Sequence, residues 1–150
     1  MIATHVFTIN GRVWVELNDS YGPEADELAR LLGRLNGNDR HSLILWKLLE
    51  GKSLDQVNPS NDARQYLQAA GSAERMTVEV RRETVDGAEQ CVLGSPHEGS
   101  PGGESVVIPW GVHEVRVETY EVFDAAQASK IFECYYRTGA PPSSCSARNL

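Results

Sequence analysis

The chain has 150 residues, of which 41% are hydrophobic and 23% charged, a composition typical of one globular domain. Its net charge of −7 and isoelectric point near 5.1 argue against nucleic-acid binding, because phosphate neutralisation requires clustered Lys and Arg. An acidic surface suits a basic protein partner, although solubility alone also explains it.

The cysteines and the N-terminus indicate a reducing compartment. Cys91, Cys134 and Cys145 form no Cys-x-x-Cys motif, and an odd number of thiols cannot all pair. The first residues, MIATHVFTING, lack the basic start and the apolar run of a signal peptide. No stretch approaches the roughly 18 apolar residues that suggest a membrane span. The sequence therefore predicts a cytoplasmic protein with free thiols.

Residues 5–17 predict a β-hairpin. Two apolar runs flank Asn10-Gly11, and both turn residues accept the positive φ that a tight type I′ turn requires. Trp14 lies in the second run between aliphatic residues, and Trp46 has similar neighbours. Both tryptophans are therefore predicted to lie in the core.

A helix is predicted over about residues 24–35, where leucines at 28, 31, 32 and 35 keep the 3.6-residue period. Residues 42–49 suit a buried strand by their length, but their leucines also fit a helix. Strand is the favoured interpretation there. Residues 65–70 stay open between a strand and a short helix capped at Asn61-Asp62.

From residue 75 onward, alternation predicts antiparallel strands. Asp86-Gly87 turns one strand into the next, and residues 105–110 and 115–120 form another pair around Gly111. Residues 94–103 are rich in Gly, Pro and Ser and predict an exposed, mobile loop.

The C-terminal segment predicts a helix over about residues 125–138. Asp124 is a good N-cap with Gln127 as its capping-box partner, and Gly139 supplies the left-handed stop. A buried stripe is expected at Ala128, Ile131, Phe132 and Tyr135. Strands followed by this helix predict an α+β fold, a mostly antiparallel sheet with both helices packed on it, within one domain over residues 1–150.

The motifs of common enzymes are missing. The chain has no phosphate-binding loop motif, and the His-Glu pairs at 97–98 and 113–114 lack the Pro-Cys-x-x-Cys partner of a zinc deaminase. Glutamates at 79, 83, 114, 118 and 121 offer acid–base pairs, but solvated strand faces explain them better. We therefore predict no catalytic residue, no metal and no cofactor.

Residues 104–124 hold five acidic residues against one arginine, and Trp110 and Tyr120 lie in the same stretch. Acidic side chains interleaved with aromatics suit a docking face for a basic protein, because aromatics anchor and charges speed association. The alternative, aromatics in the core and solvated glutamates, is equally open. The candidate partner-binding residues are Glu98, Glu104, Trp110, Glu114, Glu118 and Tyr120.

Five segments in the second half occur in a familiar order: QYLQAAG, MTVEVRRE, QCVLG, SVVIPWG and the helix ending FECYYRTGAPP. Over roughly residues 61–142 they resemble the immunity proteins of bacterial polymorphic-toxin systems, specifically those often paired with nucleic-acid deaminase toxins. The resemblance implies a small acidic cytoplasmic α+β protein that binds its cognate toxin domain and blocks the active site. It also favours a strand at residues 65–70.

The leading hypothesis is a non-enzymatic immunity protein, a monomer or weak dimer, that binds a basic toxin domain through its sheet face and the Gly-rich loop. The alternative is a small enzyme or small-molecule-binding domain, with a cleft between the sheet and the C-terminal helix lined by Glu79 and Tyr135. A third hypothesis, a DNA-binding regulator, needs residues 43–49 to be helical.

Overall fold

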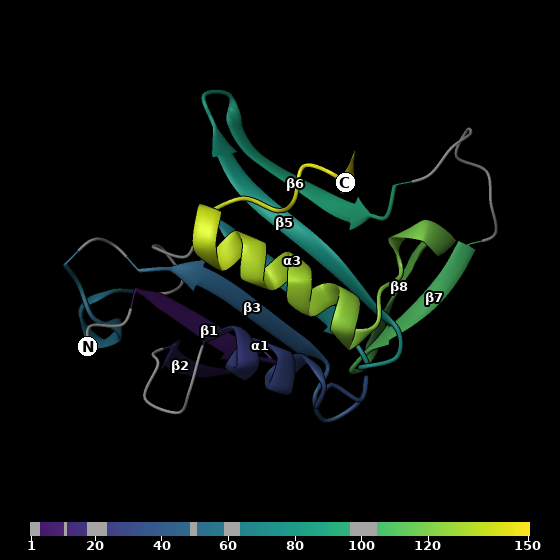
Figure 1. Cartoon of the computed structure of the whole chain (residues 1–150), viewed down its shortest axis with the longest axis horizontal. Coiled ribbons are helices and arrows are strands. Elements are labelled where there is room, and N and C mark those ends of the chain that lie inside the picture. The colour runs from purple at the N-terminus through teal and green to yellow at the C-terminus, as the bar shows by residue number, and fades with distance from the viewer. Residues whose placement is uncertain (1–3, 11, 18–23, 49–50, 59–63, 97–104) are drawn as a thin grey trace.

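A computed structural model describes residues 4–10, 12–17, 24–48, 51–58, 64–96 and 105–150 (Figure 1). The strands of the main sheet are β1 (His5–Ile9), β2 (Val13–Leu17), β3 (Ser42–Lys47), β4 (Tyr66–Gly71), β5 (Met76–Thr84), β6 (Gly87–Gly94) and β9 (Ser146–Asn149). They form one seven-stranded antiparallel sheet in the order β2-β1-β3-β4-β5-β6-β9. A separate two-stranded sheet holds β7 (Ser105–Trp110) and β8 (His113–Glu118).

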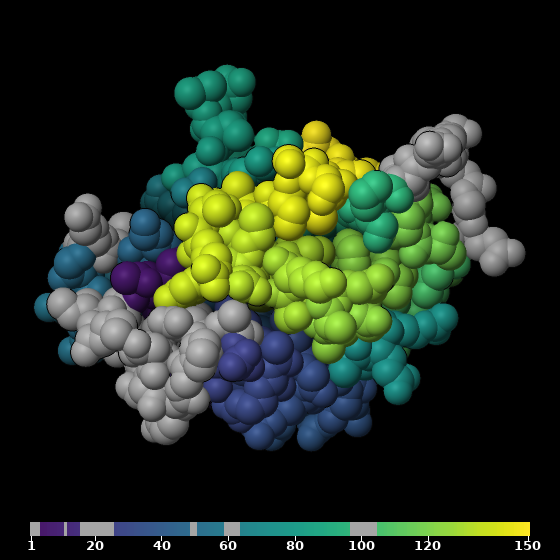
Figure 2. Space-filling view, in the orientation of Figure 1, coloured from purple at the N-terminus to yellow at the C-terminus, as the bar shows by residue number. Residues whose placement is uncertain are grey.

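Two helices cover one face of the main sheet. They are α1 (Glu24–Leu32) and α3 (Ala125–Thr138), which lie side by side in the space-filling view (Figure 2). Short 3-10 turns follow β3 and β8, at η2 (Leu54–Gln56) and η3 (Thr119–Glu121). The α+β prediction is confirmed, because the sheet is antiparallel and both helices pack on it.

The layer between helices and sheet is the main core. Strand alternation supplies one side of it and the apolar stripes of the helices supply the other. Burying each large aliphatic or aromatic side chain there contributes roughly 1.5–3 kcal/mol. The buried residues of this layer include Phe7, Leu28, Leu32, Leu43, Leu45, Leu67, Val78, Val80, Leu93, Ile131, Phe132 and Tyr135.

Helix α3 has the predicted ends and the predicted buried stripe. The Asp124 side chain accepts from the backbone N–H of Gln127 at 2.8 Å. The Gln127 side-chain oxygen accepts in turn from the backbone N–H of Asp124 at 3.0 Å. Gly139 adopts φ of 80° and its N–H donates to the C=O of Tyr135 at 2.8 Å. Helix α1 ends at Leu32, three residues before the predicted end.

Both ambiguous segments are strands. Leu43 and Leu45 of β3 enter the main core, whereas Trp46 is buried on the other face, an alternation that only a strand produces. This excludes the DNA-binding hypothesis, which needed a helix there. The segment predicted as strand or helix around residues 65–70 is β4. Strand β9 was not predicted.

We call the sheet face opposite α1 and α3 the distal face. Trp46, Glu79 and Val92 lie on it, since their sequence neighbours enter the main core. The β7–β8 hairpin packs here, where Ile108 and Val117 bury Val92. This hairpin therefore forms a second layer over part of the distal face.

The β1–β2 hairpin differs from its prediction at the turn and at Trp14. The register pairs Ile9 with Val13, so three residues lie in the turn rather than two. Because β2 lies at the edge of the sheet, Trp14 is 43% exposed, and its predicted burial is wrong. Trp46 is 1% exposed, as predicted.

Gly71 lies where β4 of the main sheet comes close to Ile108 of the β7–β8 hairpin. A Cβ atom there would lie 2.4 Å from the Arg75 carbonyl oxygen and 2.7 Å from Ile108 Cγ2. Its φ of +128° also disfavours any side chain. We expect Gly71→Ala to lower the free energy of unfolding by about 3 kcal/mol or more.

The matched control is Gly87→Ala, at φ of +130° with no atom within 4 Å of the added Cβ. It carries the backbone strain without the clash, so we expect a loss of about 1 kcal/mol. Urea unfolding of both variants measures the difference. Equal losses would show that the close contacts with Arg75 and Ile108 add nothing to the backbone strain at Gly71.

Candidate functional site

Trp110 lies at the turn of the β7–β8 hairpin, half-buried between two imidazoles. Its ring centroid is 6.4 Å from that of His41 and 6.3 Å from that of His113, both edge-on. Gly111 allows this arrangement, because a Cβ atom there would lie 3.0 Å from the His41 ring. Burial, and then the charges of Arg12 and His113, lower the pKa of His41.

The loop that carries His41 is held by the β1–β2 turn. The Asn10 amide oxygen accepts from the N–H of His41 at 2.9 Å and of Ser42 at 3.3 Å. Its amide nitrogen donates to the Asp39 carbonyl oxygen at 2.6 Å. These contacts fix the position of the His41 ring against Trp110, so the aromatic cluster is preorganised.

Of the two predicted partner-binding carboxylates that the structure describes, Glu114 and Glu118, only Glu114 is exposed. It lies opposite Pro109 in the hairpin register and forms no ion pair with any residue in the described part of the chain. Glu118 is half-buried, and its Oε2 finds no hydrogen-bond partner among those same residues. Glu98 and Glu104 lie outside the described residues.

Tyr120 is half-buried and packs against β6. A Cβ atom at Gly94 would lie 2.7 Å from Tyr120 Cδ2, so the ring lies directly on the β6 backbone. The Tyr120 carbonyl oxygen accepts from the N–H of Ser95 at 2.7 Å. Part of the Tyr120 ring is therefore engaged in packing within the fold, and its role in docking stays a prediction.

Glu121 and Asp124, two more acidic residues of the stretch 104–124, form contacts within the fold. Glu121 is 1% exposed and accepts two bonds from Arg148 of β9, at 2.9 and 2.8 Å. The hydrogen bonds from Arg148 to Glu121 raise the pKa of that arginine. Asp124 caps α3. No sequence signal indicated Arg148, because it lies 27 residues from Glu121 in a polar tail.

The distal face carries a row of polar side chains. Successive register partners across the sheet are Thr8, Ile44, Gln68, Glu79 and Val92. Thr8, Gln68 and Glu79 are buried, although polar side chains usually reach solvent. The Trp46 indole donates to Thr8 Oγ1 at 3.4 Å, and the Gln90 amide donates to Glu79 at 3.2 Å.

Glu79 does not form the cleft that the alternative hypothesis required. Tyr135 lies in the main core under α3, whereas Glu79 lies on the distal face, so the sheet separates them. The expected cleft between sheet and C-terminal helix, lined by these two residues, is therefore wrong. Burial raises the pKa of Glu79, and its hydrogen bond from Gln90 offsets part of that effect.

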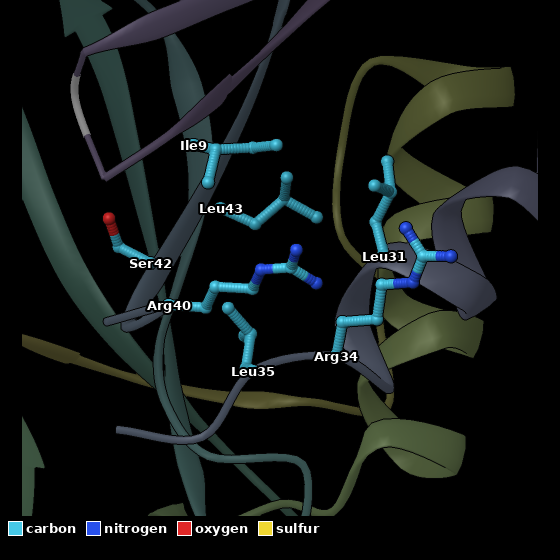
Figure 3. A pocket seen from close by; sticks show the side chains of 7 residues that line it. All are labelled: Ile9, Leu31, Arg34, Leu35, Arg40, Ser42 and Leu43. Atoms are coloured by element: carbon cyan, nitrogen blue, oxygen red, sulfur yellow. The ribbon is translucent and has the colours of Figure 1, made fainter. Parts of the chain in front are cut away.

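A small cavity of about 110 Å³ opens where α1 meets the start of β3 (Figure 3). We call it the corner pocket. Four aliphatic side chains and the guanidinium-bearing chains of two arginines line it, and Arg40 reaches across it between Leu35 and Leu43. The lining residues are Ile9, Leu31, Arg34, Leu35, Arg40, Ser42 and Leu43.

Both arginines of the corner pocket have unused donors. Among the described residues, neither guanidinium forms an ion pair or a side-chain hydrogen bond. The hydrogen bond from Asn36, and to a smaller extent the charge of Arg40, lower the pKa of the neighbouring Asp39. An apolar pocket bordered by free guanidinium groups suits a carboxylate on a short aliphatic chain.

The described residues hold no group of three or more His, Cys, Asp or Glu side chains placed to bind a metal ion. None of their helices is both long and apolar enough to cross a membrane. No family model matches the chain, and no curated protein matches it either.

The burial of Glu79 predicts a pH dependence of stability. The folded state holds the Glu79 proton more tightly than the unfolded chain, so stability should fall as the pH rises above the ordinary carboxyl pKa of 4.5. We expect Glu79→Gln to remove part of this fall and to stabilise the protein at neutral pH.

Urea unfolding between pH 4 and pH 8 tests this prediction. Glu74→Gln, which removes one exposed carboxyl outside the distal face, is the matched control. A Glu79→Gln curve that runs parallel to wild type would refute a proton held at this position.

Proposed function

We propose that this chain is an immunity protein that binds a basic toxin domain and occludes its active site. The observation that carries the proposal is that one hairpin holds both an aromatic residue packed between two imidazoles, Trp110, and the exposed carboxylate of Glu114, which forms no ion pair with the described residues. The family resemblance of residues 61–142 and the net charge of −7 support it.

The β7–β8 hairpin has the physical features of a docking element. Its turn presents Trp110, an aromatic anchor that loses little freedom on binding because His41 and His113 already hold it. Glu114 follows His113 in β8 and, by strand alternation, lies on the opposite face of the hairpin from Trp110, where its charge would attract a basic surface over long range. A proposed contact at this turn is narrower than the face predicted from residues 104–124, since Glu121 and Asp124 are engaged within the fold.

Co-expression tests the function itself. The chain should rescue cells from a toxin encoded immediately upstream of its gene and should co-elute with that toxin. A toxin with nucleic-acid deaminase activity would match the proposed pairing. Failure to rescue and to form a complex with any upstream toxin would reject the proposal.

Within such a complex, Glu114→Lys should slow association by about tenfold or more at low salt, because steering by charge acts mainly on the on-rate. Asp86→Lys makes the same charge change at the exposed β5–β6 turn and should have a much smaller effect. Stopped-flow or surface-plasmon measurements at two salt concentrations separate the variants. Equal slowing by both would assign the effect to net charge rather than to this hairpin.

The corner pocket favours a second candidate function, the binding of a small carboxylate. A 150 Å³ apolar cavity binds benzene, so a pocket of about 110 Å³ has room for a short branched aliphatic chain. Arg34 and Arg40 would bind the carboxylate at its border. This pocket lies beside α1, not beside the C-terminal helix as the alternative hypothesis expected.

Titration with 3-methylbutanoate, followed by backbone amide NMR, tests this second function. We expect shifts at Leu35, Arg40 and Leu43, and about tenfold weaker binding in Arg40→Gln. Arg75→Gln is the control, and the neutral 3-methylbutanamide should bind more weakly than the acid. Equal binding of acid and amide would exclude a role for the two arginines.

A further inference from the structure

Strand β2 is an edge strand with apolar residues exposed on both of its faces. Val13 is 52% exposed, Trp14 43% and Val15 39%. By alternation, Trp14 lies on the distal face and the two valines lie on the face that carries the helices. Edge strands normally carry charges or short polar segments that prevent pairing, so three consecutive exposed apolar residues indicate a covered edge.

The hydrogen-bond pattern of β1 shows which backbone N–H and C=O groups of β2 point away from β1. The N–H of Asn10 donates to Ser42 at 3.1 Å, and the N–H of Leu48 donates to Thr4 at 2.8 Å. Successive residues of an antiparallel ladder bond to alternate neighbours, so the even-numbered residues of β1 bond to β3 and the odd-numbered ones bond to β2. In the register of β1 and β2, the backbone groups of Val13 and Val15 therefore bond to β1. The N–H and C=O of Trp14 point away from β1, toward the open edge of the sheet.

We propose that β2 pairs with β2 of a second copy of this chain, antiparallel and centred on Trp14. The outward N–H and C=O groups of Trp14 then bond to those of its own copy, which is the two-fold arrangement that an antiparallel ladder permits. In this register Val13 of one copy lies opposite Val15 of the second copy, and Arg12 of one copy lies opposite Glu16 of the second copy. The sequence Arg-Val-Trp-Val-Glu is thus complementary to itself in both charge and apolar character.

The geometry of the two-fold axis favours this pairing. An axis perpendicular to the sheet keeps both α1 helices on one side and joins the two seven-stranded sheets into one. Val13 and Val15 of both copies form one apolar cluster on the helix side. The two Trp14 rings lie opposite each other on the distal side, where cross-strand aromatic pairs are favourable.

The other edge of the sheet does not compete for this pairing. Strand β9 exposes Ala147, Arg148 and Asn149, and Arg148 is held by Glu121. Pairing of β2 with β9 of another copy would extend without closure into fibres. It would also place Val13 and Val15 against a polar strand. A closed dimer through β2 avoids extension into fibres and sets the valines of one copy against those of the other.

Sedimentation velocity from about 1 μM to about 1 mM tests the proposal. Wild type should form dimers with increasing concentration and no larger species. Arg12→Glu and Glu16→Arg should each weaken the dimer about tenfold, because each sets like charges opposite each other twice. The double exchange Arg12→Glu with Glu16→Arg should restore the affinity to within about twofold.

Val15→Lys should abolish the dimer, because lysine on an edge strand blocks pairing. Val85→Lys is the matched control, since Val85 is 101% exposed at the β5–β6 turn. Far-UV circular dichroism confirms that each variant folds. A wild type that stays monomeric overturns the proposal, as does a dimer that tolerates Val15→Lys. A double exchange that fails to restore the dimer overturns the register.

Discussion

The burial of one apolar layer between α1, α3 and the main sheet determines where everything else in this protein can lie. Phe132 and Leu28, both fully buried, commit one face of the sheet to the helices. Surfaces for other molecules must then come from the distal face, the sheet edges or the β7–β8 hairpin. The hairpin itself covers part of the distal face through Ile108 and Val117. In the described part of the chain this list of surfaces includes the hairpin turn and the β2 edge, and the corner pocket adds one more at the margin of the helix layer, beside α1.

The sequence predicted the parts of this fold that local chemistry decides. Helix α3 has its cap, stop and stripe within a few residues of one another, so each confirms the next. The alternation of β5 is similarly local. The prediction that Trp14 is buried failed for a different reason. Its neighbours are aliphatic, but its exposure depends on β2 lying at the edge, and strand order is a property of long-range pairing that spacing does not encode.

The candidate site shows the same division. Counting charges along residues 104–124 predicted an acidic docking face, which stays a prediction; Glu114 is exposed, as that count assumes. Glu121 is buried instead, because Arg148 of β9 donates two hydrogen bonds to its carboxylate. Nothing in the sequence around Arg148 indicates that it pairs with Glu121. A carboxylate in a strand-rich segment is therefore ambiguous until its partners are known. The Trp110 cluster was equally hidden, since His41 comes from a loop far from the hairpin in sequence.

Asn10 links two of the surfaces on that list. Its side chain ties the β1–β2 turn to the loop of residues 36–41, which holds His41 against Trp110. The same turn carries Arg12, whose charge lowers the pKa of His41 and which also lies at the end of the β2 edge. Rearrangement of the β1–β2 turn would thus disturb the ring cluster on the hairpin. Coupling between sites is reciprocal. The proposed pairing at β2 and the proposed docking at Trp110 would therefore affect each other to the extent that either one shifted this turn.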